Sequence, residues 1–424
     1  MNDADIQPNH PASGRAAARR RWLCDAGALA AGAAAPQFAR ADSGDAGERC
    51  LVVVMLRGAV DGLSVVVPHA DPDYARGRRE IAIAAPGAED GALALDRLFG
   101  LHPSLAALMP LWSARRLAFV QASGSPDLTR SHFDAQDFME SGTPGRRSTP
   151  DGWLNRLLSE LDGRGGEGVR GINLGPSMPR IMAGAAQVAA LPAGTAPRRI
   201  AQASPALTDA LDRLYGADAD AASAWAALRQ TSAAIAAADA DGMDPSIAPG
   251  AVPLAGLAQD ARRLGRLLRR EPSMRAAFFS VGGWDTHVNQ GGARGPLANR
   301  LQALAAGLTA LVDGLGDRFD DTVIVVMSEF GRTVLQNGTQ GTDHGHGNVM
   351  WLLGGGVAGG RVHGRWPGLD TASLHQGRDL AITTDFRQVL AEVLERHLRL
   401  DDMRLARVLP TGSGEGGRVG VLRG

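Results

Sequence analysis

Four short stretches of the sequence combine acidic, imidazole and hydroxyl side chains in a way that could bind a metal ion. The candidate ligands in them are Asp61, then Asp285 and His287 in GGWDTH, then Glu329 in SEFGR, and Asp343, His344 and His346 in TDHGHGN. Carboxylates supply negative charge and imidazoles supply borderline nitrogen ligands. If these stretches converge in the fold, they predict a site for one or two divalent cations, with Zn, Mn, Mg and Ca as candidates.

Each stretch taken alone has a simpler explanation. A single Asp after a strand is commonly a turn or cap residue, and a His in a Gly-rich loop is often only solvated. The segment Asp343-His344-Gly345-His346 is the most specific of the four. Acidic and imidazole groups this dense are rarely needed for turn geometry alone, so this segment favours the metal hypothesis.

Apolar runs along the chain predict the elements that would position these side chains. Strands are predicted at residues 50–56, 117–121, 276–281, 322–327 and 349–353, and helices at 104–112 and 296–315. Strands that alternate with helices predict an α/β domain with a mostly parallel central sheet flanked by helices. Ligands of such sheets bind beyond the carboxyl ends of the strands, and three of the four stretches directly follow a predicted strand.

The composition excludes several classes of function. The formal net charge of the 424 residues is −1, so no sequence-wide field favours a nucleic-acid partner. All 44 basic residues are arginine, and there is no lysine. Chemistry that needs a lysine Schiff base or a lysine-containing phosphate-binding loop is therefore excluded.

The N-terminal segment has the parts of a signal peptide. These are RRRWL at 19–23, an Ala/Gly-rich apolar run over 23–35, and ARA at 39–41. Paired arginines followed by an aromatic residue and Leu are typical of the twin-arginine pattern, so residues 1–41 are predicted to direct folded export through that translocon to the periplasm or beyond. No later segment offers roughly 20 uninterrupted apolar residues, which predicts no stable membrane insertion.

The rest of the chain is predicted to form one α/β domain over residues 42–410. Within it, residues 205–270 are Ala-rich with a helical period and are interpreted as a helical insertion, either a lid over a site or a layer packed on the sheet. The Gly-rich ending, 411–424, is predicted to be a flexible tail.

Several longer motifs resemble a known bacterial family. The stretches LRGAVDGL, SHFDAQ, GGWDTH, SEFGRT and GTDHGHGNVMWLLGGG occur in this order and are similar to those of the family called domain of unknown function 1501. The resemblance covers nearly all of the predicted mature chain. It implies a fold related to the alkaline phosphatase and sulfatase superfamily, but it implies no particular substrate.

The resemblance also implies roles for individual residues. Asp61 corresponds to an early metal ligand, and Ser131 corresponds to a hydroxyl nucleophile at a helix start. An N-terminal cap is an equally good interpretation of Ser131. Asp285 and His287 correspond to a middle pair of ligands, although one residue separates them here and the superfamily usually places His four residues after Asp.

Two placements remain open for the next Asp-His pair of the superfamily. Matching by motif puts it at Asp343 and His344, whereas matching by strand puts it at Glu329 and Phe330 and leaves His344 or His346 as the late His. We prefer the second placement because Ser-acid-aromatic-Gly directly follows the predicted strand.

In the preferred placement Phe330 has replaced an imidazole ligand. One set would then be the oxygen ligands of Asp61, Glu329 and Ser131, which suits Mg, Mn or Ca. The other set, Asp285 and His287 with one late His, suits Zn or Mn.

These observations leave two functions open. The first is a metal-dependent hydrolase that acts on a small anionic ester, a phosphate or a sulfate. The second is a non-catalytic exported protein that keeps the fold for binding or assembly, which the Phe replacement favours. Convergence of the predicted ligands in one shell would support the enzyme.

Overall fold

The computed structural model describes residues 49–147, 149–161, 169–175, 177–194, 252, 254, 256–410 and 417–423. All of them belong to one compact unit, Gly44–Gly424. The predicted signal peptide and most of the predicted insertion lie outside the described residues.

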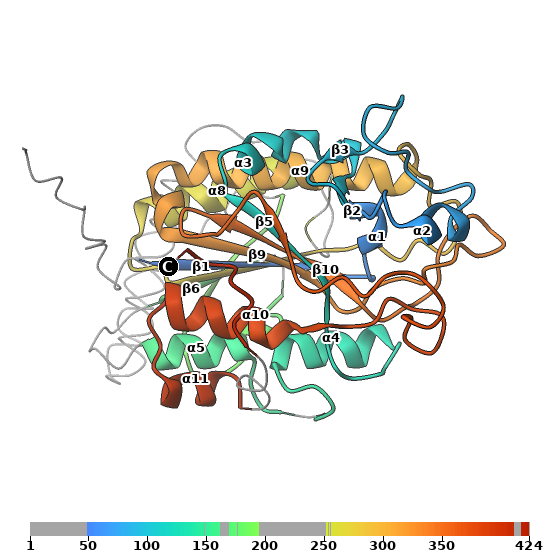
Figure 1. Ribbon diagram of the computed structural model, residues 1–424. Coiled ribbons are helices and arrows are strands. Elements are labelled where there is room, and N and C mark those ends of the chain that lie inside the picture. Colours follow the sequence, from blue (N-terminus) through green and yellow to red (C-terminus); the bar gives the residue numbers. More distant parts are fainter. Residues whose placement is uncertain are drawn as a thin grey trace, which may run out of the picture. The chain divides into compact units, whose positions relative to one another are not determined.

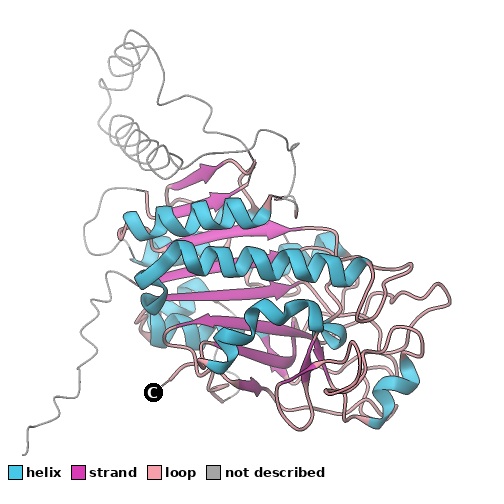
Figure 2. Ribbon diagram, turned by 90° about the horizontal axis from the view of Figure 1, so that it is seen from above, coloured by secondary structure: helices cyan, strands magenta, loops and turns pink. Residues whose placement is uncertain are grey.

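A central sheet of nine strands organises the described part of the chain (Figures 1 and 2). Its order is β11 (Arg361–His363), β5 (Leu117–Gly124), β10 (Asn348–Gly354), β9 (Thr322–Ser328), β1 (Cys50–Leu56), β8 (Ala276–Val281), β6 (Gly171–Leu174) and β7 (Val188–Leu191), and β12 (Thr384–Asp385) pairs with β5. β10 runs antiparallel to β5 and β9, whereas the other pairings are parallel. The predicted fold class, a mostly parallel sheet flanked by helices, is confirmed.

The strands are buried on both faces, which explains their continuous apolar sequences. In β1, CLVVVML, every residue is buried. Val52 and Val54 pack on one side of the sheet, and Val53 and Met55 pack on the other. This alternation follows from the two-residue period of a strand.

Helices cover each face (Figure 1). On one side lie α3 (Met109–Ser113), α8 (Leu257–Arg270) and α9 (Pro296–Leu315), and on the other lie α4 (His132–Ser141), α5 (Trp153–Leu161), α10 (Phe386–Glu392) and α11 (Asp402–Val408). The predicted helix 296–315 is α9. The predicted helix 104–112 is a 3-10 turn, η1 (Pro103–Leu108), followed by α3. The end of the predicted insertion is α8, which packs against α9.

Short elements complete the described fold. They are α1 (Gly62–Val65), β2 (Val66–Val67), α2 (Pro72–Gly77), β3 (Leu93–Ala94), β4 (Gly100–Leu101), η2 (Arg180–Met182), η3 (Gly316–Asp321) and η4 (Val393–His397). The strands β2, β4 and β3 form a second, three-stranded sheet.

The reversed direction of β10 decides where the candidate site can form. Because β10 runs against its neighbours, its first residue, Asn348, lies at the edge where β5 and β9 end. The segment 342–347 before β10 therefore meets the loops that follow β5, β9, β1 and β8. This arrangement brings together residues that are far apart in the sequence.

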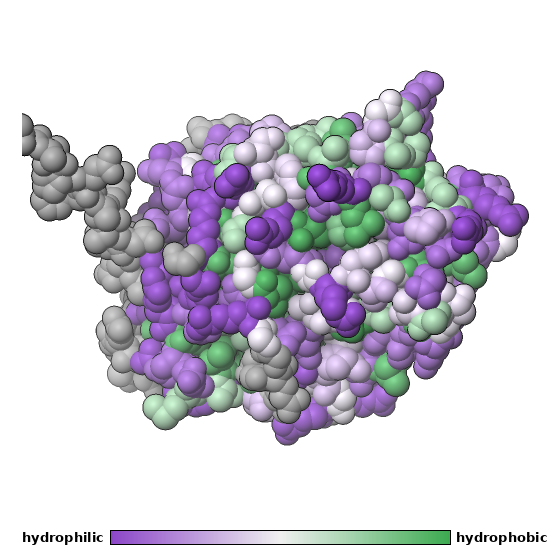
Figure 3. Space-filling view, in the orientation of Figure 1, coloured by the Kyte–Doolittle hydropathy of each residue, from purple (hydrophilic) through white to green (hydrophobic). Residues whose placement is uncertain are grey.

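Among the described helices, none has the length and apolar sequence needed to cross a bilayer. On the face shown in Figure 3, apolar residues lie in small groups between hydrophilic ones.

Within the predicted tail, Val421 is buried and its carbonyl accepts a hydrogen bond from the Ala358 amide at 2.8 Å, so this described part packs on the domain.

Candidate metal centre

Four side chains from three loops converge at the carboxyl edge of the sheet. His132 is the first residue of α4, which follows β5. Asp285 and His287 lie on the loop after β8, and His344 lies on the segment before β10. We call these four residues the His–Asp cluster. They come from loops of the central sheet, and each loop begins or ends at a strand fixed by the core.

Neighbouring ligand atoms of the cluster lie about as close together as those of a bound metal ion, although His132 and His287 meet only through His344 and Asp285. His344 Nε2 is 3.0 Å from Nε2 of His132 and 3.0 Å from Nε2 of His287. Asp285 Oδ1 is 2.9 Å from His287 Nε2 and 3.2 Å from His344 Nε2, and its Oδ2 is 3.5 Å from His132 Nε2. A tetrahedral zinc shell has ligand atoms on the order of 3.3 Å apart.

Each imidazole is held from behind by an acceptor on its other nitrogen. The Nδ1 atom of His132 is 2.8 Å from Glu329 Oε1, and that of His287 is 2.9 Å from Asp343 Oδ1. The Nδ1 atom of His344 is 2.9 Å from the carbonyl oxygen of Arg130. A carbonyl or an ionised carboxylate can only accept, so we assign the hydrogen to Nδ1 in each ring.

This tautomer leaves a lone pair on each Nε2 atom when the imidazoles are neutral. The lone pair of His344 Nε2 would then face those of His132 and His287 at 3.0 Å, beside the Asp285 carboxylate, which is repulsive without a cation between them. Backing of an imidazole by a carboxylate or a carbonyl is the usual arrangement around a metal ion. The donor set therefore fits a divalent cation, and its nitrogen-rich character fits zinc best.

Neighbouring charges set the protonation of the cluster. Burial by itself would raise the pKa of Asp285, but the Arg332 guanidinium, 2.5 Å from Asp285 Oδ1, brings that pKa below its usual value. Burial lowers the pKa of His344, and the nearby His132 lowers it further. The hydrogen bond to Glu329 raises the pKa of His132, so a proton competes with a cation at that ring.

A buried hydrogen-bonded chain fixes Arg332 behind Asp285. Arg332 Nε donates to Thr342 Oγ1 at 3.1 Å, and that hydroxyl donates to Gln290 Oε1 at 2.7 Å. Gln290 Nε2 in turn donates to Asp61 Oδ2 at 2.7 Å. The orientation of one cluster ligand is thus tied to the interior of the domain.

Glu329 holds His132 in place but is not a metal ligand, because both of its carboxylate oxygens accept hydrogen bonds from the protein. Its Oε1 accepts hydrogen bonds from the Gly58 amide at 2.7 Å, from His132 and from Gln136 Nε2 at 2.9 Å, and its Oε2 accepts one from Ser328. Burial would raise the pKa of Glu329, yet these donors hold it below its usual value. Gly58 has φ +113°, and a Cβ there would lie 2.8 Å from the Asp285 amide nitrogen, so the close approach of the two loops needs glycine.

The structure brings some of the residues predicted from sequence together and separates others. Asp285, His287 and His344 share the cluster, and Asp343 and Glu329 hold two of its imidazoles from behind. Ser131 caps the N-terminus of α4, and its hydroxyl accepts from the Asp134 amide at 3.5 Å.

The two remaining candidates have other partners. Asp61 is fully buried and forms an ion pair with Arg78, whose other hydrogen bonds go to backbone carbonyls and Ser64. His346 stacks on His375 with ring centres 4.4 Å apart, and burial lowers its pKa to about 4. The side-chain hydrogen bonds of Asp61 involve no member of the cluster, since its donors are Arg78, Ser64 and Gln290.

His132 is the cluster member that sequence reasoning missed. Its only signal was its position in SHFDAQ, directly after Ser131 and at the start of a helix. Phe330, expected at a position where the superfamily has an imidazole, stacks on the His132 ring at 4.9 Å between centres. Among the described residues, the group whose ligand atoms all lie within 4.8 Å of one another is His132, Asp285 and His344, and His287 joins it through its contacts with His344 and Asp285.

Comparison with known families now places the sequence. A family model described as "Protein of unknown function (DUF1501)" matches residues 48–410. The chain belongs to this family. The resemblance expected from the motifs is confirmed, and no curated protein sequence matches the chain.

Solved structures similar to this member of the DUF1501 family are distant. "Ps i-CgsB in complex with k-i-k-neocarrahexaose" is 10% identical, with 84% of this chain and 74% of that chain covered and a TM-score of 0.37. A protein in the alkaline phosphatase superfamily from Vibrio parahaemolyticus is 10% identical, with coverages of 72% and 60% and a TM-score of 0.36.

A third similar structure contains zinc. The C-terminal periplasmic domain of EcEptC from Escherichia coli, in a complex with Zn, is 9% identical, with coverages of 73% and 74% and a TM-score of 0.33. Likeness at these scores is no basis for transferring a function or a ligand.

Proposed function

We propose that this protein is a hydrolase of a phosphate or sulfate ester that works with one divalent cation, zinc in the first place, held by His132, Asp285, His287 and His344. One observation carries the proposal. Three imidazoles, each with Nδ1 held by an acceptor, direct Nε2 toward one another and toward a carboxylate. This donor set suits a cation and is unfavourable without one.

The cluster is also accessible to a substrate. The side chains of Asp285 and His287 are 41% and 39% exposed, whereas Arg332 behind them is buried. When bound, a cation of this kind supplies a Lewis acid for an ester oxygen and for water. The chain's own contribution is to fix Asp285 through Arg332 and to hold each imidazole in the tautomer that has a free Nε2.

The reaction would cleave one ester bond. The oxygen of a water molecule, or of the Ser131 hydroxyl, forms a bond to phosphorus or sulfur while the bond to the alcohol oxygen breaks, and the alcohol leaves with a proton. On the Ser131 route, a water molecule then forms a bond to phosphorus or sulfur while the bond to the serine oxygen breaks, which releases phosphate or sulfate and returns the proton to Ser131. Ser131 is the candidate nucleophile because it directly precedes His132. Loss of all turnover in Ser131→Ala would favour Ser131, and retained turnover would favour water.

A non-catalytic role is the second candidate, and one observation favours it. Four protein ligands would fill a tetrahedral shell, and closed four-ligand shells are typical of structural zinc sites, whereas catalytic sites keep one position open. In that case the protein would bind the cation but hydrolyse no ester. It would serve as an exported binding or assembly protein.

We also propose export through the twin-arginine translocon, based on RRRWL at 19–23. The protein would then acquire its fold, and its cation, before it crosses the membrane. Replacing Arg19, Arg20 and Arg21 by Gln should retain the full-length precursor in the cytoplasm. Unchanged delivery of this variant to the periplasm would contradict the proposal.

The test of function begins with metal content. The mature protein, wild type and the variants His287→Ala and His344→Ala, is reconstituted with zinc and measured by elemental mass spectrometry. His375→Ala is the matched control, because its imidazole lies on His346 outside the cluster. We expect close to one zinc per chain in the wild type and the control, and loss in both cluster variants.

Activity then separates the two candidates. The metal-loaded proteins are assayed with p-nitrophenyl phosphate and p-nitrophenyl sulfate. Hydrolysis that is lost in both cluster variants and kept in His375→Ala supports the hydrolase. Bound zinc without hydrolysis favours the binding protein, and a wild type that binds no metal contradicts both forms of the proposal.

A further inference from the structure

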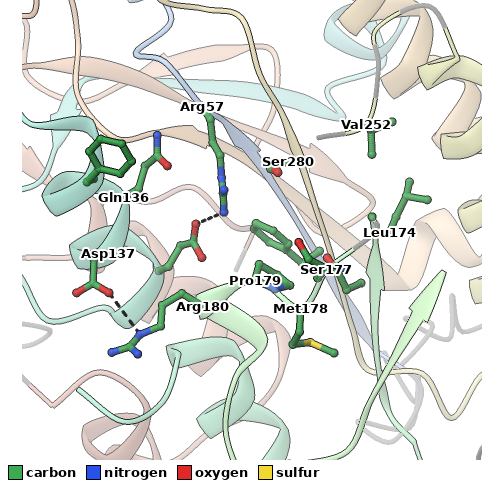
Figure 4. A pocket seen from close by; sticks show the side chains of 15 residues that line it. Arg57, Gln136, Asp137, Leu174, Ser177, Met178, Pro179, Arg180, Val252 and Ser280 are labelled. Carbon is green, nitrogen blue, oxygen red and sulfur yellow. Dashed lines mark hydrogen bonds and ion pairs between the residues drawn. The ribbon is translucent and has the colours of Figure 1, made fainter. Parts of the chain in front are cut away.

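The lining of a pocket of about 450 Å³ (Figure 4) includes Phe133, which directly follows the cluster member His132 in the sequence. The pocket lies at the carboxyl ends of β1, β6 and β8, and α4 contributes to both places, with His132 in the cluster and Gln136 on the pocket wall. Gln136 Nε2 donates to Glu329 Oε1, the same oxygen that holds His132. The side chains of Gln136 and Glu329 therefore connect the pocket wall to His132.

The charged groups of this α4 pocket neutralise one another. The lining contains two arginines and two acidic residues. Arg57 Nη2 is 2.5 Å from Glu140 Oε1, and Arg180 Nε is 3.4 Å from Asp137 Oδ1 (Figure 4). The formal charge of the lining is thus zero, and an anionic ligand would find both guanidinium groups already paired with carboxylates. The charge pattern favours an uncharged ligand.

The same arginines have further hydrogen-bond donors to offer. The Nε atom of Arg57 is buried and has no hydrogen-bond acceptor in the described part of the structure, and that of Arg180 has only its ion pair with Asp137 at 3.4 Å. Buried donors rarely stay unsatisfied in native proteins. Both arginine side chains are about one-third exposed, at 33% and 29%, so small rotations would present their N–H groups to oxygen atoms in the pocket.

Apolar side chains are exposed at the same pocket. Phe133 is 89% exposed and Met178 is 46% exposed, and both line it. Exposure of a phenyl ring to water is unfavourable unless something packs on it. The pocket thus combines an apolar contact surface with many hydrogen-bonding groups and no net charge.

We propose that the α4 pocket binds an uncharged, polyhydroxylated ring, such as a glycosyl residue. Such a ring has a C–H face that packs on Phe133 and Met178, and hydroxyl oxygens that accept from Arg57 and Arg180 and donate to Asp137 and Glu140. In the hydrolase proposed above, this ring is the alcohol part of the ester that reacts at the cluster. Only the identification of the ring as the alcohol part of the ester rests on the proposed function. Binding of the ring depends on the pocket lining, which contains no member of the cluster.

Ligand binding can be measured directly on the mature, zinc-reconstituted protein. Saturation-transfer-difference NMR is recorded with methyl glycosides of glucose, galactose and mannose, with benzoate as an anionic ring and cyclohexanol as an apolar ring. We expect at least one glycoside to bind more tightly than benzoate and cyclohexanol. Phe133→Ala should weaken that binding about five- to tenfold through the lost aromatic contact.

Two further variants make the test specific. Ser177→Trp places a large side chain at the pocket lining and should abolish binding. Met403→Ala is the matched control, since Met403 is 72% exposed but lies on α11 and not on the pocket lining, and its binding should equal that of the wild type. Metal content is measured on the same samples.

The outcomes separate the two proposals. Glycoside binding that is weakened in Phe133→Ala and lost in Ser177→Trp supports the pocket assignment, whether or not zinc is bound. Absence of glycoside binding, tighter binding of benzoate or cyclohexanol, or binding unchanged in both pocket variants would overturn it, even if one zinc per chain is present. Absence of zinc would contradict only the proposed function.

Discussion

Asp61 and Asp285 both follow a parallel strand of the same sheet, yet their surroundings are opposite. The Asp61 carboxylate is fully buried and receives hydrogen bonds from Arg78, Ser64 and Gln290. The Asp285 carboxylate is 41% exposed and, apart from Arg332, faces imidazole nitrogens. One carboxylate is saturated by donors of the protein, whereas the other has a single protein donor, Arg332, and otherwise faces imidazole nitrogens.

This difference shows how a structural carboxylate can be distinguished from a metal ligand. Oxygen atoms that already accept several hydrogen bonds have no capacity left for a cation, whereas a carboxylate with one protein donor and imidazole neighbours keeps lone pairs that a cation can use. The same pattern applies to the imidazoles, since those of the cluster have Nδ1 held and Nε2 directed at one another. The number of available donors, rather than the position after a strand, decides the role.

The largest effect should come from exchanging the two carboxylates for amides. Asp61→Asn leaves the buried Arg78 without its counter-charge and should lower the free energy of unfolding by about 3–5 kcal/mol. Asp285→Asn, at a partly exposed site, should change stability far less but remove most of the bound zinc. Urea unfolding and elemental analysis of both variants measure this, and equal destabilisation by the two would contradict the comparison.

Protonation of the buried His102 should lower the stability of the fold in acid. Its Nδ1 accepts from the Ser104 amide and its Nε2 donates to the Gly292 carbonyl, so the neutral ring is required, and burial lowers its pKa to about 4. The unfolded chain binds this proton near pH 6.5, so stability is complete above that pH and falls as the pH drops toward 4, by up to roughly 3 kcal/mol.

Thermal unfolding between pH 7 and pH 4 would test this effect. Metal-free protein is used, because release of a bound metal ion in acid would also change the unfolding temperature. His102→Gln keeps an acceptor and a donor but cannot titrate in this range. We expect its unfolding temperature to depend less on pH than that of the wild type. An identical pH dependence in both proteins would rule out His102 as the cause.

Glu329 sharpens the comparison, because it is buried like Asp61 but serves the cluster. Glu329→Gln keeps the shape and weakens the acceptor behind His132. Changes of this kind typically cost about 10–100-fold in metal affinity. Competition with a chelator measures the affinity, and Asp343→Asn provides the equivalent change behind His287. Unchanged affinity in both variants would show that the carboxylates do not support the imidazoles.

The smallest effect concerns Ser131, whose hydroxyl caps α4 next to His132. Ser131→Ala should reduce the free energy of unfolding by about 1 kcal/mol, which is typical for loss of an N-cap. Zinc content should remain at the wild-type level, because Ser131 is not a ligand. Loss of zinc in this variant would move Ser131 into the metal shell and contradict the four-residue cluster.

The sequence supported the prediction of the strands but not of all contacts between their loops. Continuous apolar runs predicted the core strands β1, β8 and β9 because burial on both faces leaves a strong local pattern. The reversed direction of β10 has no such local pattern, although it is what brings His344 to the other loops.

Partners distant along the chain explain the residues that could not be assigned. Asp61 looked like a ligand because Arg78 and Gln290, 17 and 229 residues away, satisfy its carboxylate only in the folded state. His132 was overlooked because the hydroxyl of Ser131 beside it gave the stronger chemical signal. Pairing of an imidazole with Glu329 is a property of three-dimensional packing, which no spacing in the sequence records.

The most direct test of the His–Asp cluster is X-ray absorption spectroscopy of the zinc-loaded mature protein and of His132→Ala. The structure predicts a shell with three imidazoles and one carboxylate oxygen in the wild type, at the usual zinc distances of about 2.0–2.2 Å. In His132→Ala we expect one imidazole fewer or loss of the metal. A shell made only of oxygen ligands, or the same imidazole count in both proteins, would contradict the proposed centre.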